Sequence, residues 1–408
     1  MKKKLLFVIN TMGRAGAETA LLALFRQLDP AQVDVDLFVL TGQGELTAEI
    51  PDYVRLLNTG HDSSSVLNWD GRKKLTWKVL RALCARGTAI RLFPYLLGNL
   101  LDMLRRGSLN VDKLLWRVMS DGAPRWDTSY DLAVAFLEGG STYYVADHVN
   151  AAKKAAFVHI DHTMAGYTRK LDRDCYERFD RIFTVSAEVE DHFLEVYPEH
   201  RQKEEVFHNI LDVSEIRRLS TLPGGFTDDY GGTRILTVGR LTAQKAFEVS
   251  IEALRLLKDG GGDFRWYVLG EGEQRSRLEQ KISDLGLKDD FLLCGAVDNP
   301  YPYFAQTDLY VHASRFEGKS IAIQEAQILE RPVLASDCSG NRENVSDGED
   351  GKLCPFSPEG IRDGILWLME HRSERERYAK AAGRKYQDQP DAAEKLLSLV
   401  RENEGCAV

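Results

Sequence analysis

Short apolar runs separated by longer amphipathic stretches dominate the first part of this 408-residue chain. An amphipathic stretch over residues 17–28 predicts a helix, because its apolar positions recur at helical spacing. The apolar runs predict buried strands at residues 4–10, 33–40, 54–57, 131–137, 155–158 and 181–185. A chain that alternates strands and helices in this way is typical of a doubly wound α/β sheet.

A second alternation follows a stretch rich in Gly, Pro and Thr at residues 221–233, a composition typical of a linker between domains. The strands expected beyond it are residues 234–238, 264–269, 291–294, 309–311 and 332–335, and the helices are 247–258, 273–285, 320–329, 359–369 and 373–386. The length also exceeds that of one typical domain. We therefore predict an N-terminal domain over residues 1–212, a linker over 213–233, a C-terminal domain over 234–388, and a last helix within 389–408 that packs back towards the first domain.

An insert over residues 60–125 interrupts the first alternation. Its part from 70 to 118 holds eleven Lys and Arg against three Asp, a net charge of +8 in a chain whose total is −9. Leu, Phe, Tyr and Trp are interleaved with these charges. Basic amphipathic helices of this kind can lie on an anionic membrane surface. The alternative, which we favour from the sequence alone, is a helical insertion whose apolar face packs on the domain and whose basic face is solvated.

Composition excludes several classes of protein. A net charge of −9 argues against nucleic-acid binding, and the six cysteines are scattered without a C-x-x-C pair, as expected of reduced thiols. The apolar run after Met1 to Lys4 is too short for a signal peptide, and no run approaches transmembrane length. Asp34 and Asp36 form a D-x-D pattern, but we expect them on the solvent side of an edge strand and predict no metal site. We therefore expect a cytoplasmic protein.

The most informative stretch is S-R-F-E-G-K-S-I-A-I-Q-E-A-Q at residues 314–327. A strand that runs into a Gly-containing loop and then a helix is where α/β sheets bind phosphorylated ligands, because free N–H groups and the positive end of the helix dipole lie there. Glu317 falls in the loop and Glu325 in the second helical turn, separated by roughly 8 Å of helix rise. The alternative is an exposed loop glutamate followed by an ordinary helix-surface glutamate.

Cations and glycines follow other predicted strands. Arg240 and Lys245 come after the strand at 234–238 and would suit a pyrophosphate, with two unrelated surface charges as the alternative. Gly16 lies in the first strand-to-helix turn, where it would let backbone approach a phosphate or sugar, although a purely structural turn explains it equally well. His159 follows the strand at 155–158 and would face an inter-domain cleft, unless it is a structural histidine.

These motifs resemble those of retaining glycosyltransferases of the family 4 type. The matching elements are V-G-R-L at 238–241 followed by Gln244-Lys245, V-L-G-E-G at 268–272, and S-R-F-E-G-K-S-I-A-I-Q-E-A at 314–326. The resemblance implies an α/β GT-B fold, in which two Rossmann-like doubly wound domains face a central cleft. The chain departs from the family pattern at three positions, with Ala15 before Gly16 in place of a double glycine, Ser320 where many members have proline, and Ala246 where glycine or asparagine is common.

The resemblance also implies roles for individual residues. Arg240 and Lys245 would hold the diphosphate, Glu317 the hydroxyls of the donor sugar, and Glu325 the ribose. His159 matches the family's cleft histidine. The remaining donor contacts would come from Gly16 near the β-phosphate, Gly239, Val297 beside the nucleobase, and the backbone of Gly318, Lys319, Ser320 and Ile321.

The activity implied is transfer of a hexosyl unit from a nucleotide diphosphate sugar, with UDP the family's commonest carrier, to a hydroxyl of a glycan or lipid-linked acceptor in bacterial surface polysaccharide synthesis. The anomeric configuration would be retained, and no metal or other cofactor would be required. Separately from the resemblance, the basic composition of residues 70–118 makes them the segment that would contact the inner face of the membrane if the protein binds there peripherally. Two alternatives are a GT-B sugar-nucleotide epimerase and a non-catalytic sugar-nucleotide-binding protein.

Overall fold

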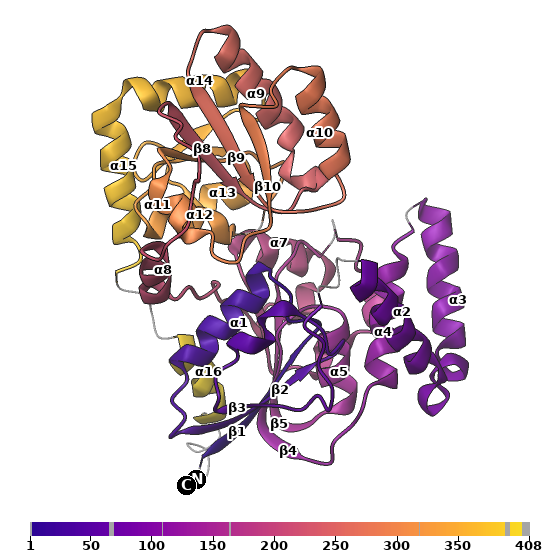
Figure 1. The fold of residues 1–408 in the computed structure, drawn as a ribbon. Helices are drawn as coiled ribbons and strands as arrows, with labels where there is room; N and C mark the ends of the chain where they lie inside the picture. The colour runs from indigo at the N-terminus through magenta and orange to yellow at the C-terminus, as the bar shows by residue number, and fades with distance from the viewer. Residues whose placement is uncertain are drawn as a thin grey trace. The chain divides into compact units, whose positions relative to one another are not determined.

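The computed structural model describes residues 2–64, 69–107, 109–162, 165–317, 319–387 and 392–401. The chain forms two compact units, each built on its own parallel sheet (Figure 1). Unit 1 comprises Met1–Leu211 and Asp391–Val408, and unit 2 comprises Asp212–Pro390. Both are α/β units, as the alternation of apolar runs predicts.

Unit 1 contains a seven-stranded parallel sheet in the order β3-β2-β1-β4-β5-β6-β7. Its strands are β1 (Lys3–Ile9), β2 (Val33–Val39), β3 (Val54–Leu56), β4 (Ser129–Ala135), β5 (Asn150–Val158), β6 (Arg181–Thr184) and β7 (Glu204–Val206). Its helices are α1 (Gly16–Gln27), α2 (Trp69–Cys84), α3 (Thr88–Arg106), α4 (Val111–Gly122), α5 (Gly140–His148), α6 (Arg169–Asp172), α7 (Ala187–Val196) and α16 (Ala392–Arg401).

The two faces of this sheet build separate cores, because successive side chains of a strand point to opposite faces. Leu5, Phe7 and Ile9 of β1 pack in one apolar cluster with α1 and α16. Leu6 and Val8 pack in another with α4, α5 and α7. The last helix, α16, therefore completes the core of unit 1, and the Lys395 ammonium also donates to the Val206 carbonyl at 2.8 Å. Residues 392–401, within the segment expected to pack back towards the first domain, thus lie in unit 1.

Unit 2 contains a six-stranded parallel sheet in the order β10-β9-β8-β11-β12-β13. Its strands are β8 (Thr233–Val238), β9 (Phe264–Leu269), β10 (Phe291–Gly295), β11 (Leu309–His312), β12 (Val333–Ser336) and β13 (Lys352–Cys354). Its helices are α8 (Val213–Ser220), α9 (Phe247–Asp259), α10 (Arg275–Asp284), α11 (Tyr301–Gln306), α12 (Ile321–Ile328), α13 (Ser339–Asn344), α14 (Pro358–Glu370) and α15 (Arg372–Arg384).

The segment 213–233, expected as a linker, is instead part of unit 2. Its first residues form α8, which the Asp212 side chain caps at the Glu215 amide and which buries Ile216. The following loop is fixed by polar contacts, since the Asp228 carboxylate accepts hydrogen bonds from the Arg234 and Arg265 guanidinium groups. Its Gly, Pro and Thr content therefore reflects an irregular backbone held by side chains, and the boundary between the units falls at residue 211.

The D-x-D pattern also lies in a different environment from that expected. Strand β2 pairs with both β1 and β3, so it is not an edge strand. Asp34 is exposed, but Asp36 is buried and accepts hydrogen bonds from Arg55 and from the Tyr130 hydroxyl, at 2.8 Å for the latter. The carboxylate of Asp36 is thus engaged in structural hydrogen bonds within unit 1.

The insert folds as the helices α2, α3 and α4. Helix α4 packs on α5 and so joins the insert to the sheet. Arg117 of α4 is buried, forms an ion pair with Asp147 at 2.5 Å, and lies 3.8 Å above the ring of Tyr143. No helix within the described ranges is both long and apolar enough to cross a bilayer.

Candidate active site

The carboxyl ends of β8 and β11 carry the two motifs singled out in the sequence. These strands are neighbours at the point where the strand order of unit 2 reverses, because β9 and β10 continue to one side and β12 and β13 to the other. Ligands of open α/β sheets bind at such switch points. We call residues 239–246 the β8 loop and residues 313–320 the β11 loop.

Backbone contacts hold the two loops together. The Arg315 amide donates to the Gln244 carbonyl at 3.0 Å, and the Gln244 side-chain amide donates to the Phe316 carbonyl at 3.0 Å. The position of Lys245 relative to Glu317 is therefore set by the loops and not only by their side chains. Gln244, which precedes Lys245 in the sequence motif, thus links the β8 loop to the β11 loop, since it bonds to a residue 72 positions later in the chain.

Lys245 and Glu317 form a largely buried ion pair. The Lys245 ammonium contacts Oε1 of Glu317, and the two side chains are 17% and 8% exposed. The same oxygen accepts hydrogen bonds from Ser314 Oγ at 2.6 Å and from His312 Nε2 at 3.1 Å. Burial opposes ionisation of this carboxyl, but the charge of Lys245 and the His312 hydrogen bond outweigh it and hold the pKa of Glu317 well below its usual range. Glu317 is therefore a fixed carboxylate.

His312 is a component of the site that the sequence analysis missed. It is the last residue of β11 and is fully buried, with Nδ1 3.0 Å from the Tyr310 hydroxyl and Nε2 3.3 Å from Ser320 Oγ. Burial, together with the charge of Lys245, lowers the pKa of His312, so the imidazole is neutral. The contacts fit a tautomer in which Nε2–H donates to Glu317 and Nδ1 accepts from Tyr310. The sequence feature that could have indicated this role is the position of His312 at the end of the apolar run L-Y-V-H.

Arg240 differs from Lys245 in having no ionic partner. Its side chain is exposed, and it forms no ion pair or side-chain hydrogen bond with the part of unit 2 that the structure describes. It follows Gly239, whose position lies against the Lys245 side chain, since a Cβ there would be 3.5 Å from Lys245 Cε. The two cations expected to act as a pair thus have different environments, because Lys245 is neutralised by Glu317 and Arg240 is free to bind an anion.

Gly270 of the V-L-G-E-G motif allows the carboxyl ends of β8 and β9 to lie very close together. Its φ is +152°, and a Cβ at this position would lie 1.9 Å from the Gly239 carbonyl oxygen. Only glycine allows the end of β9 to approach the start of the β8 loop so closely. Ala246 at the other end of the loop has φ 45° and ψ 42°, a left-handed conformation that glycine and asparagine adopt more easily than alanine. Alanine in place of the family's glycine or asparagine at position 246 therefore keeps the left-handed backbone of the loop, at the cost of local backbone strain.

The N-terminus of α12 presents uncapped amide groups. Ser320 is the N-cap residue, but its hydroxyl contacts His312 and makes no capping hydrogen bond. The first amides of α12, beginning with Ile321, are thus available to an anion in addition to the helix dipole. Burial lowers the pKa of the neighbouring Lys319. Gly318, expected to contribute a backbone amide, lies outside the described residues.

Glu325 is buried in the second turn of α12 and is not a surface glutamate. It is 8% exposed and accepts a hydrogen bond from the Tyr301 hydroxyl at 3.0 Å. Burial raises the pKa of Glu325 to about 7, against the effect of that hydrogen bond. Val297 and Tyr301 are partly buried on one apolar cluster of unit 2, and Tyr301 is the contact that the sequence did not predict.

Gly16 and His159 belong to unit 1, and each follows the carboxyl end of a strand of its sheet. Gly16 is the first residue of α1, whose N-cap Ala15 offers no side-chain cap. The His159 ring packs against Phe136 and Phe157, and burial lowers the pKa of His159 to about 4. The His159 amide donates to Glu138 Oε2 at 3.0 Å, while its buried Nε2 makes no hydrogen bond. His159 is thus a neutral imidazole with one unused nitrogen.

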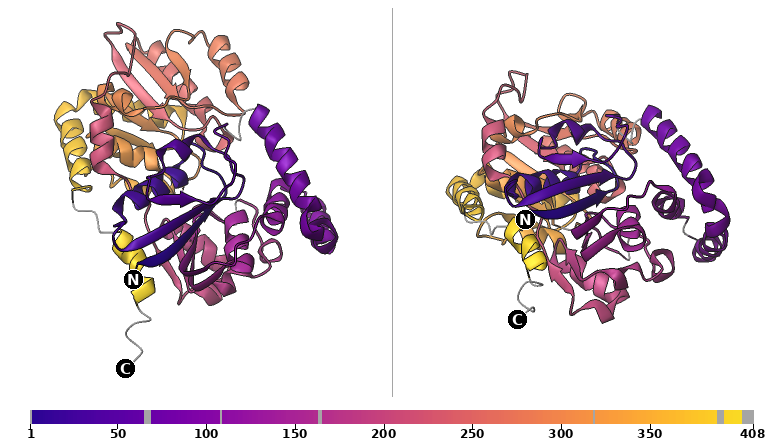
Figure 2. Two further views of the ribbon diagram at one scale, coloured as in Figure 1. Left: turned by 60° about the horizontal axis from the view of Figure 1, so that its bottom comes forward. Right: turned by 90° about the horizontal axis from the view of Figure 1, so that it is seen from below.

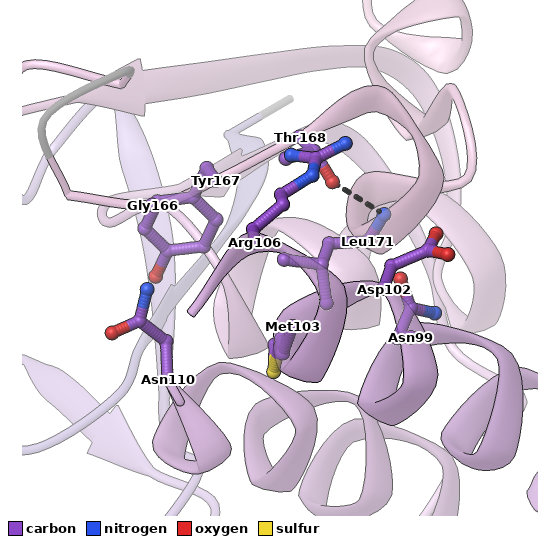
Figure 3. Close-up of a pocket in the computed structure, with 9 residues that line it drawn as sticks. All are labelled: Asn99, Asp102, Met103, Arg106, Asn110, Gly166, Tyr167, Thr168 and Leu171. Atoms are coloured by element: carbon purple, nitrogen blue, oxygen red, sulfur yellow. Dashed lines mark hydrogen bonds between the residues drawn. The ribbon is translucent and has the colours of Figure 1, made fainter. Parts of the chain in front are cut away.

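Unit 1 also contains a pocket of about 350 Å³ between α3 and the segment 166–171 (Figure 3). Two of its polar groups are already paired, since Asp102 forms an ion pair with Lys170 and Thr168 caps the Leu171 amide. Across the described ranges of both units, no three His, Cys, Asp or Glu side chains are grouped so that they could hold a metal ion.

Comparison with known proteins agrees with this geometry. The family described as "Glycosyl transferases group 1" matches residues 229–385. The chain is 32% identical over 151 residues to an alpha-D-kanosaminyltransferase of Streptomyces kanamyceticus, a match covering 36% of this chain and 39% of the relative. It is 29% identical over 209 residues to an N-acetylgalactosamine-N,N'-diacetylbacillosaminyl-diphospho-undecaprenol 4-alpha-N-acetylgalactosaminyltransferase of Campylobacter jejuni, covering 51% of this chain and 55% of the relative. The chain thus spans about two fifths to one half of the length of these curated relatives.

The fold extends the likeness to the full length. The crystal structure of HepE from Anabaena in complex with UDP-glucose aligns with 99% of this chain and 100% of its own, with a TM-score of 0.64 and 16% identity. This likeness concerns the fold, which is of the GT-B type. Residues 229–385, which contain both the β8 and the β11 loop, match the family of group 1 glycosyl transferases.

Proposed function

We propose that unit 2 binds a nucleotide diphosphate sugar at the carboxyl ends of β8 and β11, and that the protein transfers the hexosyl unit to an acceptor hydroxyl with retention of configuration. The proposal rests on two features that follow adjacent strands at the carboxyl end of the sheet. Arg240 after β8 is exposed and unpaired, and the N-terminus of α12 after β11 is uncapped. A diphosphate satisfies both, because it offers oxygens to a planar guanidinium fork and to backbone amides.

The same groups would accelerate the reaction. Transfer places negative charge on the departing diphosphate, and cations and amides fixed before the reaction stabilise that charge without reorganisation. Arg240 is the principal cation in this scheme, since the charge of Lys245 is shared with Glu317. The proposed reaction uses these protein groups and requires neither a metal ion nor another cofactor.

Glu317 would orient the donor sugar. All three of its described hydrogen-bond donors contact Oε1, so the carboxylate is held in one rotamer with its charge intact. A fixed carboxylate can accept hydrogen bonds from sugar hydroxyls and hold the anomeric carbon in place for attack. His312 acts through Glu317 and is therefore a positioning residue in this scheme.

Glu325 would accept the ribose hydroxyls, with Val297 beside the base. Because the pKa of Glu325 is about 7 without ligand, a ribose that donates two hydrogen bonds favours the ionised form. Nucleotide affinity should therefore rise with pH between about 6 and 8. This dependence would distinguish a ribose contact at Glu325 from a purely structural role.

The carrier and the acceptor are proposed from the relatives. HepE was crystallised with UDP-glucose, and the Campylobacter jejuni relative is named for a diphospho-undecaprenol acceptor. We extend to this chain a UDP-sugar donor and a glycan or lipid-linked acceptor of bacterial surface polysaccharide synthesis. Gly16 and His159 of unit 1 stay predicted donor contacts, and an uncapped helix start and an unused buried imidazole nitrogen support that prediction.

A thermal-shift panel of UDP, GDP, ADP and AMP tests the donor site. A ligand that binds only the folded state at about 100 times its Kd adds about 2.7 kcal/mol of stability. We expect one nucleoside diphosphate to raise Tm, and Arg240→Ala to weaken its binding by about ten- to a hundredfold, the loss expected for charged hydrogen bonds. Arg255→Ala, at an exposed arginine of α9, is the matched control and should bind normally.

Two results would contradict the proposal. One is a folded parent protein that no nucleoside diphosphate stabilises. The other is an Arg240→Ala variant that binds as tightly as Arg255→Ala. Once a donor is identified, the anomeric configuration of the product, read by NMR coupling constants, tests retention separately from binding.

A further inference from the structure

Helix α3 carries two apolar stripes on different faces. The inner stripe packs inside unit 1 through Leu92 and Met103, with Tyr95 and Leu96 partly buried beside them. The outer stripe is exposed and consists of Ile90, Phe93, Leu97, Leu100, Leu101 and Leu104. Five of these positions, 90, 93, 97, 101 and 104, recur at steps of three or four residues, and Leu100 adjoins Leu101, so the six share one face of the helix. Ile90 and Phe93 are 83% and 62% exposed.

The outer stripe has no partner in the described part of unit 1. Helix α3 contacts α4 and α2, and α4 contacts α5 next to the sheet, so α3 is the outermost layer of the insert. The three views of Figures 1 and 2 show α3 along the margin of unit 1, with one long side uncovered. A helix that is apolar on both faces is expected where both faces are buried. A continuous exposed apolar surface of this kind therefore marks an interaction site.

The segment that contains this stripe is strongly basic. The segment 70–118 has a net charge of +8, whereas the remainder of the chain has −17, since −9 minus +8 is −17. Arg91 and Arg105 follow Ile90 and Leu104 by one position, about 100° further around the helix, and so lie on the same flank of the outer stripe. Both arginines are exposed, and the one acidic residue of α3, Asp102, is engaged by Lys170.

We propose that α3 docks unit 1 on an anionic lipid bilayer, with its outer stripe in the interfacial region and Arg91 and Arg105 against the headgroups. An amphipathic helix with apolar residues on one side and basic residues at its border binds such a surface by apolar burial and by attraction to anionic lipids. No described helix is long and apolar enough to cross the bilayer, so the contact would be peripheral.

Charge also favours a bilayer over a second copy of the chain. A symmetric dimer through α3 would bring Arg91 and Arg105 into the interface twice, because the same surface is used twice in a two-fold interface. Like charges at such a contact oppose association. An anionic bilayer instead supplies opposite charge across the whole helix. The outer stripe is also a helix surface that the pocket behind α3 does not include, since that pocket is lined by Asn99, Met103 and other inward residues.

Co-sedimentation of the full chain with sucrose-loaded vesicles tests the proposal. We expect at least tenfold stronger binding to vesicles of phosphatidylglycerol and phosphatidylcholine than to phosphatidylcholine alone. Raising NaCl from 0.1 to 1 M shortens the Debye length from about 10 to about 3 Å and should weaken this binding. The double variant Ile90→Asp, Phe93→Asp should lose at least tenfold in binding, and Arg91→Glu, Arg105→Glu should lose the preference for anionic lipid.

The matched control is Leu366→Asp, the same kind of change at a 36% exposed leucine of α14 in unit 2, which should bind vesicles like the parent. All substituted positions are exposed, and circular dichroism checks that the variants fold. The proposal is overturned if the parent chain does not bind anionic vesicles, or if the Ile90→Asp, Phe93→Asp variant binds them as well as the parent does. The proposal is also overturned if the parent is an oligomer by light scattering, the Ile90→Asp, Phe93→Asp variant is a monomer, and neither protein binds vesicles. Nucleotide thermal shifts measured on the same variants should stay unchanged, so this test is independent of the proposed transfer reaction.

Discussion

Removing the ammonium group of Lys245 should expose the cost of holding Glu317 as a buried carboxylate. Lys245→Met leaves the carboxylate, 8% exposed, with His312 and Ser314 as its described donors. At an effective dielectric constant of ~20 and a separation of ~3 Å, the attraction lost is about 5 kcal/mol. Part is regained because Lys245 no longer has to be desolvated. We therefore expect the free energy of unfolding to fall by about 3 kcal/mol at pH 7.5.

The reverse change should cost less. In Glu317→Gln the lysine is 17% exposed and can turn towards solvent, and the amide still accepts from Ser314, so the expected loss is about 1 kcal/mol. The double variant should cost less than Lys245→Met alone, because it has no buried charge without a partner. The two substitutions should then be coupled by about 2 kcal/mol. Because the pKa of Glu317 is lowered in the folded state, this stabilisation is present above the ordinary pKa of a glutamate and is lost in acid.

Urea unfolding of the four proteins at pH 7.5, followed by circular dichroism, measures this cycle in the transition that contains unit 2. The control is Lys281→Met, which breaks an exposed pair with Glu252 of the same residue types and should cost no more than about 1 kcal/mol. Strict additivity of Lys245→Met and Glu317→Gln would refute the reasoning, because independent groups show no coupling. So would a Lys245→Met loss no larger than that of the control.

Two further predictions concern the same edge of unit 2. Glu325→Gln should remove a pH dependence: the raised pKa of about 7 means that the parent loses stability as pH rises from about 4.5 through 7, by about 3 kcal/mol at most, and the variant should not. Urea unfolding at pH 5 and pH 8 measures this, with exposed Glu349→Gln as a control that should keep the parent's slope, and a Glu325→Gln slope equal to the parent's would contradict it. Gly270→Ala should lower the free energy of unfolding by about 3 kcal/mol or more, because its Cβ would meet the Gly239 carbonyl at 1.9 Å. Gly231→Ala, where a Cβ meets no atom within 4 Å, should be nearly neutral, and equal losses in both variants would show that the β8–β9 contact is not as close as described.

The local patterns predicted most elements of both sheets. The strand expected at residues 264–269 is β9 as observed, and the helix expected at 247–258 ends one residue later as α9. Strands β7 and β13 were not predicted, because each begins with a charged residue and contains no apolar run. Helix α8 was hidden in the expected linker, since only its contacts with the rest of unit 2 make eight residues helical.

Sequence reasoning singled out four side chains of the candidate site, but neither His312 nor Tyr301, and none of the contacts between them. Arg240, Lys245, Glu317 and Glu325 could be chosen because each lies in a loop that follows a strand or in the helix after that loop. The sequence analysis placed Arg240 and Lys245 together as free cations, whereas the β8 loop turns Lys245 onto Glu317 and leaves Arg240 exposed. Which cation is neutralised depends on a loop-to-loop contact, and no local pattern records it.

The sequence by itself determined the two α/β alternations, the motifs at 238–245 and 314–327, and the positive charge of the insert, because these depend on residue type and spacing alone. Only the tertiary structure decided that His312 joins the site, that Glu325 is buried with a raised pKa, and that the outer stripe of α3 has no partner. Burial and pairing depend on residues distant in the chain. Periodicity shows that a side is apolar but not whether another element covers it.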